Sequence, residues 1–193
     1  MELSHLANIR TGVVLSRKEA TPLEYTAEYK ALNLKAVSEQ GVVDKEILEP
    51  YYASERLKME YFTRERDVLL RLSAPYTAVW INENDIDLLV PAHFAIIRAK
   101  PRLLDSHYLY WWLTKNKRIF YRMASGATMM GTISSGYIAD MAINVPPIDL
   151  QREIGKIIRL SEREQQLLER LGTKKRQLSD ALIAQIENGG LTL

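Results

Sequence analysis

The chain has 193 residues, of which 47% are hydrophobic, so it can bury a core as one domain with an extension or as two small domains. Its 26 Lys and Arg against 24 Asp and Glu leave a net charge of +2, so any basic surface has to come from local clustering. The absence of cysteine excludes disulfides and thiolate metal sites and agrees with a reducing compartment. The sequence lacks an uninterrupted run of about 18 apolar residues and a secretion signal at residues 1–12, so we expect a soluble, cytoplasmic protein without a membrane partner.

Short β-like runs alternate with loops up to Pro146, which is typical of a mixed α+β domain. The runs are rich in β-branched or aromatic residues and cover residues 13–17, 29–37, 67–72, 77–81 and 93–99. One helix is predicted over 105–123, where Leu109, Trp112, Leu113, Phe120 and Met123 recur on one apolar face. Asp105 or Ser106 is expected to cap its start, and Gly126 to end it. Residues 125–137 are small, polar and glycine-rich, which predicts a loop, and 137–145 are then expected to return to the core as a strand.

The paired prolines Pro146 and Pro147 end this last predicted strand, and the composition then changes to long charged and aliphatic side chains. A helix from about Leu150 to about Glu187 would be roughly 55 Å long at 1.5 Å per residue, longer than a small domain can cover. Heptad spacing predicts an apolar seam of Ile154, Ile157, Leu168, Leu171, Leu178 and Leu182. Ser161, Glu164, Lys175 and Gln185 interrupt it. We therefore predict an α+β globular domain (1–147), a long C-terminal coiled-coil helix (148–188) and a flexible tail (189–193).

The order of these signals resembles the specificity subunits of type I restriction-modification enzymes. The resemblance covers nearly the whole chain. It begins with RTGVVLSR and YKALNLKAVSEQGVV, continues through RERDVLLRLSAPYTAVWI, VPAHFAIIRAKP, DSHYLYWWLTKNK and SGATMMGTIS, and ends with INVPPIDLQREIGKII in the place of the family's "IPLPPLxEQxxIA". Family members usually carry two target-recognition domains and two long helices. This chain has the signals for one of each, so it resembles a half-length specificity subunit.

The resemblance implies a target-recognition domain that reads one half of a bipartite site in double-stranded DNA. It also implies a helix that sets the spacing and docks the methyltransferase (modification) subunit, with a restriction subunit in the same assembly. A half-length chain would pair through its helix as a homodimer, and its DNA target would then be a palindrome.

Three groups of residues are candidates for DNA contact. The first is a basic rim on the predicted helix: Lys115, Lys117, Arg118 and Arg122. The second is the predicted loop, whose hydroxyls and flexible apolar tips suit base edges or a thymine methyl: Ser125, Thr128, Met129, Met130, Thr132 and Ser134. The third lies in or just after strands: Lys35, Arg71, Ser73 and Tyr76. Cations near a helix C-terminus also simply offset its dipole, and such a loop is also consistent with an ordinary solvated surface.

Signals for catalysis are missing from the sequence. It has neither a glycine-rich phosphate loop after a strand nor histidines at metal-ligand spacing, so we expect no catalytic residue, cofactor or metal. Asn144 is separated from the prolines by Val145, and Ile148 replaces the stacking aromatic, which excludes the base-gripping loop of amino-methyltransferases. Two other classes stay open. One is a metal-dependent nuclease that uses Glu83, Asp85 and Asp87, and the other is a scaffold whose function is the coiled coil itself.

Overall fold

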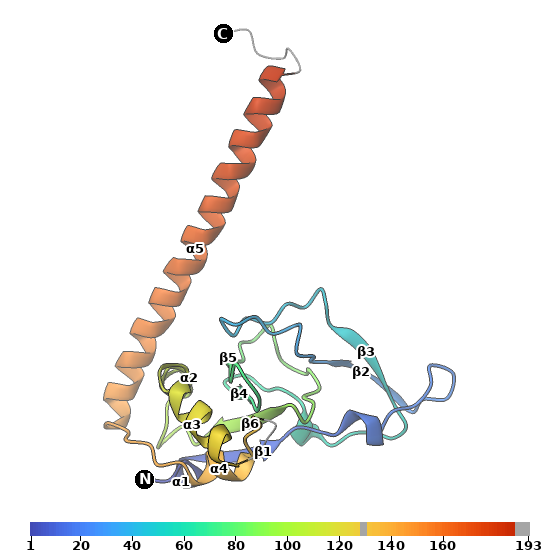
Figure 1. Cartoon of the computed structure of the whole chain (residues 1–193), viewed down its shortest axis with the longest axis vertical. Helices are drawn as coiled ribbons and strands as arrows, with labels where there is room; N and C mark the ends of the chain where they lie inside the picture. The colour runs from blue at the N-terminus through green and yellow to red at the C-terminus, as the bar shows by residue number, and fades with distance from the viewer. Residues whose placement is uncertain (128–130, 188–193) are drawn as a thin grey trace. The chain divides into compact units, whose positions relative to one another are not determined.

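The computed structural model describes residues 1–127 and 131–187, with only the backbone of 125–127. The chain divides into two compact units, Met1–Gly155 and Lys156–Leu193. Within the described ranges, no helix combines the length and the apolar character needed to cross a membrane. Figure 1 shows the course of the chain through its helices and strands.

The first unit is built on a four-stranded antiparallel sheet with the order β1-β6-β4-β5. The strands are β1 (Ala7–Thr11), β4 (Val68–Arg71), β5 (Ala78–Trp80) and β6 (Phe94–Ala99). In the middle of the sheet Val68 pairs with Ile97 of β6 and Trp80 of β5. The predicted strands at 67–72, 77–81 and 93–99 are confirmed, because each is a nearly continuous apolar run that is buried. The sequence pattern did not reveal β1.

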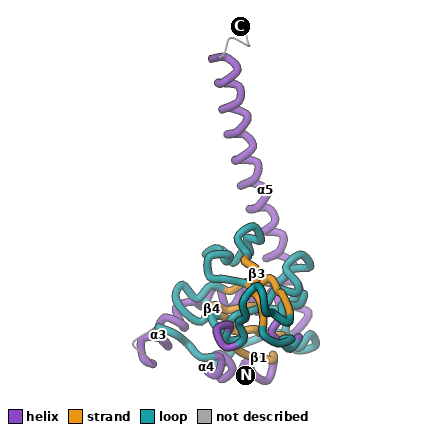
Figure 2. Tube along the Cα trace, turned by 90° about the vertical axis from the view of Figure 1, so that its right-hand side faces the viewer, coloured by secondary structure: helices purple, strands orange, loops and turns teal. Residues whose placement is uncertain are grey.

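A smaller sheet pairs β2 (Ala27–Ala31) with β3 (Glu49–Ala53), and loops surround both sheets (Figure 2). The prediction of a strand over 13–17 is wrong. Val13 makes only an isolated bridge to Pro91, and Leu15–Arg17 form the 3-10 helix η1 because no neighbouring strand extends the pairing. The strand predicted over 29–37 ends early, since Asn33 Oδ1 accepts the backbone N–H groups of Lys35 and Ala36 and bends the chain. A second 3-10 helix, η2, covers Met59–Tyr61.

The predicted helix over 105–123 is two helices, α2 (Ser106–Lys115) and α3 (Lys117–Ala127). The predicted Asp105 cap is confirmed, because its Oδ1 accepts the N–H groups of His107 and Tyr108 at 3.0 Å. The break falls at Asn116, whose Nδ2 and backbone N–H both donate to the carbonyl of Trp112. Gly126 does not end the helix, which continues to Ala127. Leu109, Leu113 and Phe120 are fully buried in the core beside the sheet, as predicted.

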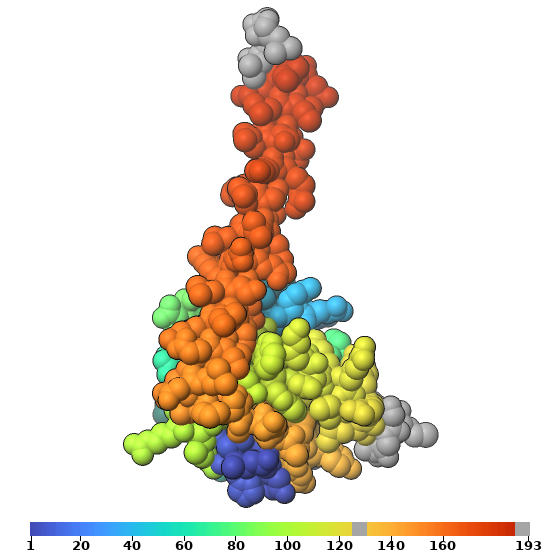
Figure 3. All heavy atoms as spheres, turned by 90° about the vertical axis from the view of Figure 1, so that its left-hand side faces the viewer, coloured from blue at the N-terminus to red at the C-terminus, as the bar shows by residue number. Residues whose placement is uncertain are grey.

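The predicted strand over 137–145 is also wrong, because the short helix α4 occupies Ser135–Asp140. Thus the predicted loop over 125–137 is helical at both described ends. The segment after α4 is held by the N-terminus: Leu3, in helix α1 (Leu3–Leu6), donates its N–H to the carbonyl of Met141, and Ile143 donates to the carbonyl of Met1. Figure 3 shows these N-terminal residues, in blue, beside residues near 140 in light orange. α3 and α4 lie on the same side of the domain in Figures 1 and 2.

The predicted long helix is confirmed as α5, Ile148–Glu187, which has 40 residues. Its beginning is part of the first unit. Gln151 is buried and its side chain bonds to three backbone groups, the N–H of Asp105 and the carbonyls of Leu103 and Pro146. Ile154, predicted as a seam residue, is half-buried against the domain core. A Cβ on Gly155 would lie only 2.7 Å from Asp105 Oδ1, so glycine permits this close approach.

Candidate nucleic-acid interface

A tight turn, Ser73–Tyr76, follows β4 and begins and ends with a predicted site residue. The backbone N–H of Tyr76 donates to the carbonyl of Ser73 at 2.9 Å and closes the turn. Just before it, the Nε of Arg71 donates to Ser73 Oγ at 3.4 Å. Ser73 also forms an antiparallel bridge with Thr132, while the carbonyl of Leu72 accepts the N–H of Ile133 at 2.8 Å. The structure therefore brings Arg71, Ser73 and Thr132 together at the C-terminal end of β4.

Tyr76, at the end of the turn, is buried beside this group of residues. Its side chain is 1% exposed, and its hydroxyl donates to the carbonyl of Gly131 at 2.5 Å. Its ring centroid lies 4.9 Å from that of Tyr121 in an edge-on arrangement at 89°. Burial raises the pKa of the Tyr76 phenol, and Tyr121 adds to this, so the hydroxyl stays protonated and able to donate at neutral pH. A residue predicted to touch DNA thus has its functional atoms turned inward in this structure.

The predicted basic rim comes from two helices instead of one. Lys115 is exposed at the end of α2, and Lys117, Arg118 and Arg122 belong to α3. A shallow surface hollow is lined by Arg118, Tyr121 and Arg122. Within residues 1–127 and 131–187, none of the four cations forms an ion pair. Without such an ion pair in the described ranges, these cations are suited to contact phosphates.

The other candidates are placed differently. Lys35 is exposed in the loop after β2, and no described contact links it to the Ser73–Tyr76 turn. Ser134 is exposed and caps α4 by accepting the N–H of Tyr137 at 3.3 Å. Thr128, Met129 and Met130 lie outside the described residues, as does the side chain of Ser125. Sequence reasoning missed Tyr121, although an aromatic residue beside Arg118 and Arg122 at helical spacing was a usable signal.

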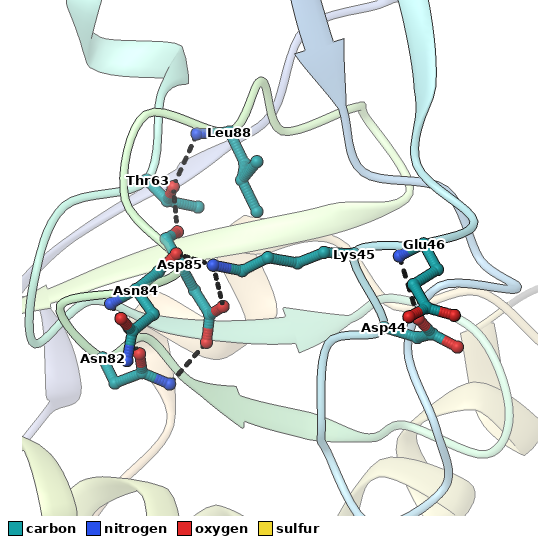
Figure 4. A network of polar contacts seen from close by, with 8 residues as sticks. All are labelled: Asp44, Lys45, Glu46, Thr63, Asn82, Asn84, Asp85 and Leu88. Atoms are coloured by element: carbon teal, nitrogen blue, oxygen red, sulfur yellow. Dashed lines mark hydrogen bonds and ion pairs between the residues drawn. The ribbon is translucent and has the colours of Figure 1, made fainter.

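The acidic run at 81–87 is part of a structural network, shown in Figure 4. Asp85 is nearly buried, accepts a hydrogen bond from Asn82 Nδ2 and lies 3.4 Å from Lys45 Nζ. Its backbone carbonyl accepts the hydroxyl of the buried Thr63 at 2.7 Å, and that hydroxyl accepts the N–H of Leu88. Among the described residues, no group of three His, Cys, Asp or Glu is arranged to hold a metal ion. The contacts of Asp85 account for its burial without a metal.

The second unit carries an exposed apolar face. Ile157 is 67% exposed and Leu178 is 60% exposed, and the other predicted seam residues of this unit, Leu168, Leu171 and Leu182, are exposed as well. The heptad count missed further exposed apolar residues that widen this face: Leu160, Leu167, Ile183 and Ile186. Leu160, Leu167 and Ile186 lie three or four residues from a seam residue, and this spacing was the available signal. An apolar face of this extent on a single helix is typical of a surface that pairs with another helix.

The fold is that of the specificity subunits of type I restriction-modification systems. The HsdS subunit of Thermoanaerobacter tengcongensis matches 99% of this chain with a TM-score of 0.59 at 16% identity, and the S subunit of M. genitalium matches 97% with a TM-score of 0.55 at 13% identity. A chain solved in work on complex assembly and conformational transition of the type I R-M system matches 99% with a TM-score of 0.63 at 16% identity. This chain spans less than half of those proteins, 46%, 45% and 43% of their lengths. No family model and no curated protein matches the sequence.

Proposed function

We propose that the chain is a non-catalytic DNA-recognition subunit of a type I restriction-modification system and reads one half of a bipartite target. The observation that carries this proposal is the clustering of Arg71, Ser73 and Thr132 at the turn that ends with Tyr76, on a chain with the specificity-subunit fold. Tyr76 packs against Tyr121 of α3, which lines a surface hollow together with Arg118 and Arg122. Cations of this kind position a protein on phosphates, and hydroxyl and guanidinium groups discriminate bases. The proposed function places the chain in the cytoplasm with the modification and restriction subunits that would supply the chemistry.

The proposal is tested by selecting duplexes from a random library with the full chain, alone and together with the modification subunit of its system. A single domain makes few base contacts, so we expect weak selection by the chain alone and stronger selection by the complex. The recovered sequences should contain two inverted half-sites. Recovery of unrelated sequences in both selections would overturn the proposal. If a partner subunit nevertheless bound the chain through α5, the scaffold function would replace it.

The exposed face of α5 supports the further proposal that two copies pair through this helix, and its charges favour an antiparallel arrangement. In a parallel pair each residue faces its own copy, so Glu164 would meet Glu164 and Lys175 would meet Lys175 in the seam. An antiparallel pair that joins Leu168 to Leu171 of the second copy instead places Glu164 opposite Lys175. It also places Ile157 opposite Leu182.

The register of this antiparallel pair follows from the same two charges. A shift by one heptad in either direction would set both Glu164 and Lys175 against leucine or isoleucine, leaving each charge unpaired in an apolar seam. Opposite charges therefore select one register, and the apolar residues around Leu168 and Leu171 supply its stability. A pair with this two-fold symmetry would read a palindromic target.

A further inference from the structure

The proposed DNA-binding surface is assembled from three pieces of chain that are far apart in sequence. They are the turn Ser73–Tyr76, the helix α3 and the segment Gly131–Ser134. Base discrimination requires side-chain donors and acceptors to be held in a narrow geometry, whereas contact with phosphates tolerates more movement. The residue that fixes the three pieces relative to one another therefore controls how well the surface can discriminate sequences.

Tyr76 is the residue that touches all three pieces. It closes the turn through its own backbone N–H, which donates to Ser73. Its ring lies against α3, with centroids 4.9 Å from Tyr121 and 6.0 Å from Phe120. Its hydroxyl holds the carbonyl of Gly131, the residue before Thr132.

The backbone on both sides of this contact has positive φ angles. Tyr76 has φ of 51°, a left-handed conformation that a bulky aromatic residue adopts only where its surroundings impose it. Gly131 has φ of 60°, which glycine accepts without strain, so the chain can turn its carbonyl toward Tyr76. Two hydrogen bonds therefore hold the segment that carries Thr132. One runs from the N–H of Ile133 to the carbonyl of Leu72, and the other from the Tyr76 hydroxyl to the carbonyl of Gly131.

We infer that Tyr76 is a positioning residue for sequence discrimination: its buried hydroxyl sets the place of Thr132 relative to Ser73 and α3 without contacting DNA. This inference rests on the proposed function and revises the direct contact expected for Tyr76. Removal of the hydroxyl alone should loosen the segment Gly131–Ser134, while the ring continues to fill the core beside Phe120. The cations of α3 should then still bind phosphates of any sequence.

The test compares the full chain with Tyr76→Phe and with the matched control Tyr108→Phe. Tyr108 is also buried, and its hydroxyl donates to the carbonyl of Asn144 at 3.2 Å, outside the proposed surface. Fluorescence anisotropy measures the affinity of each protein for a duplex selected by the wild-type chain and for a shuffled duplex of equal length. We expect Tyr76→Phe to lower the ratio of the two affinities by about 3- to 10-fold, with the shuffled duplex and the salt dependence unchanged. Tyr108→Phe should keep the wild-type ratio.

A purely structural role for Tyr76 gives a different result. Partial unfolding reduces the binding-competent fraction, and so lowers both affinities by the same factor and leaves their ratio unchanged. An unchanged ratio in Tyr76→Phe would overturn this inference and leave the proposed function standing. If the wild-type chain preferred no selected duplex over a shuffled one, the proposed function would fall and this inference with it. Hydrogen exchange provides a readout without DNA, since the amides of Thr132 and Ile133 should exchange faster in Tyr76→Phe than in Tyr108→Phe.

Discussion

Gln151, in the first turn of α5, accepts a hydrogen bond from the backbone N–H of Asp105 at 3.0 Å. Its amide also donates to the carbonyls of Pro146 at 2.8 Å and Leu103 at 3.2 Å. The side chain is 1% exposed, and its replacement by leucine removes all three of these hydrogen bonds at the start of α5. We expect Gln151→Leu to lower the free energy of unfolding of the domain by about 3 kcal/mol, counting roughly 1 kcal/mol per bond.

The measurement for Gln151→Leu is urea unfolding followed by tryptophan fluorescence, because all tryptophans lie within residues 80–112. Gln165→Leu is the matched control on an exposed part of the same helix and should change the free energy by less than about 0.5 kcal/mol. Equal effects in the two variants would show that Gln151 does not fasten the start of α5.

Two glycines of α5 should respond in opposite ways to alanine. At Gly155 the new Cβ would lie 2.7 Å from Asp105 Oδ1, an atom already held by two backbone N–H groups. We expect Gly155→Ala to lower the free energy of unfolding by about 1–2 kcal/mol, because the clash outweighs the gain in helix propensity. At Gly172 no atom lies within 4 Å of the added Cβ, so Gly172→Ala should stabilise the helix by up to about 1 kcal/mol. Urea unfolding followed by circular dichroism measures both, and stabilisation by Gly155→Ala would contradict the packing described.

The cations of the hollow should govern the salt dependence of DNA binding. Each phosphate contact contributes about 0.9 to the slope of log K against log salt concentration, so Arg118→Ala combined with Arg122→Ala should reduce this slope by about 2. Anisotropy titrations at several salt concentrations measure it. Arg56→Ala removes an exposed arginine from the loop after β3 and should leave the slope unchanged. The same slope in all three proteins would mean that α3 does not meet the DNA backbone.

Engineered cysteines can report the direction of helix pairing, since the chain contains no native cysteine. Ile157→Cys and Leu182→Cys are made as separate variants and mixed under mild oxidation. An antiparallel pair sets residue 157 opposite residue 182 of the second copy, so only the mixed disulfide should form efficiently. In a parallel pair each variant would instead crosslink to itself, because residues 157 and 182 would be about 37 Å apart along the helix. Light scattering on the unmodified chain independently measures its mass in solution. A monomer at all concentrations would overturn both the parallel and the antiparallel pair.

Magnesium should not stabilise the domain through the acidic run. Asp85 already lies against Lys45 and Asn82, and its neighbours satisfy the polar groups around it (Figure 4). We expect the thermal midpoint to move by less than about 1 °C on addition of millimolar Mg²⁺, whereas a site filled a hundredfold above its Kd would add about 2.7 kcal/mol. Differential scanning calorimetry measures the midpoint. A clear rise that Asp85→Asn abolishes would favour the nuclease alternative instead.

The sequence determined the features that depend on neighbours along the chain. The apolar runs of β4, β5 and β6 identified central strands, Asp105 identified the start of α2, and the paired prolines before Ile148 identified the start of a long helix. The sequence did not predict β1 and β3. Each is stabilised by pairing with a strand elsewhere in the chain, which the local pattern does not reveal. The segment around Ser134 has the composition of a loop, so the sequence predicted no helix there. In the structure Ser134 Oγ accepts the N–H of Tyr137 and caps α4.

Tertiary structure decided the roles of residues whose sequence position allowed two readings. Tyr76 follows a strand and carries a hydroxyl group, so its sequence position fits a surface residue as well as a buried one. The contacts with Gly131 and Tyr121 show that it is buried. Ile154 keeps the heptad spacing of a seam but packs on the core of its own domain. Periodicity along a chain specifies which residues share a face, because that depends only on backbone geometry. The partner of that face depends on residues distant in sequence, and for this reason only the folded chain could assign it.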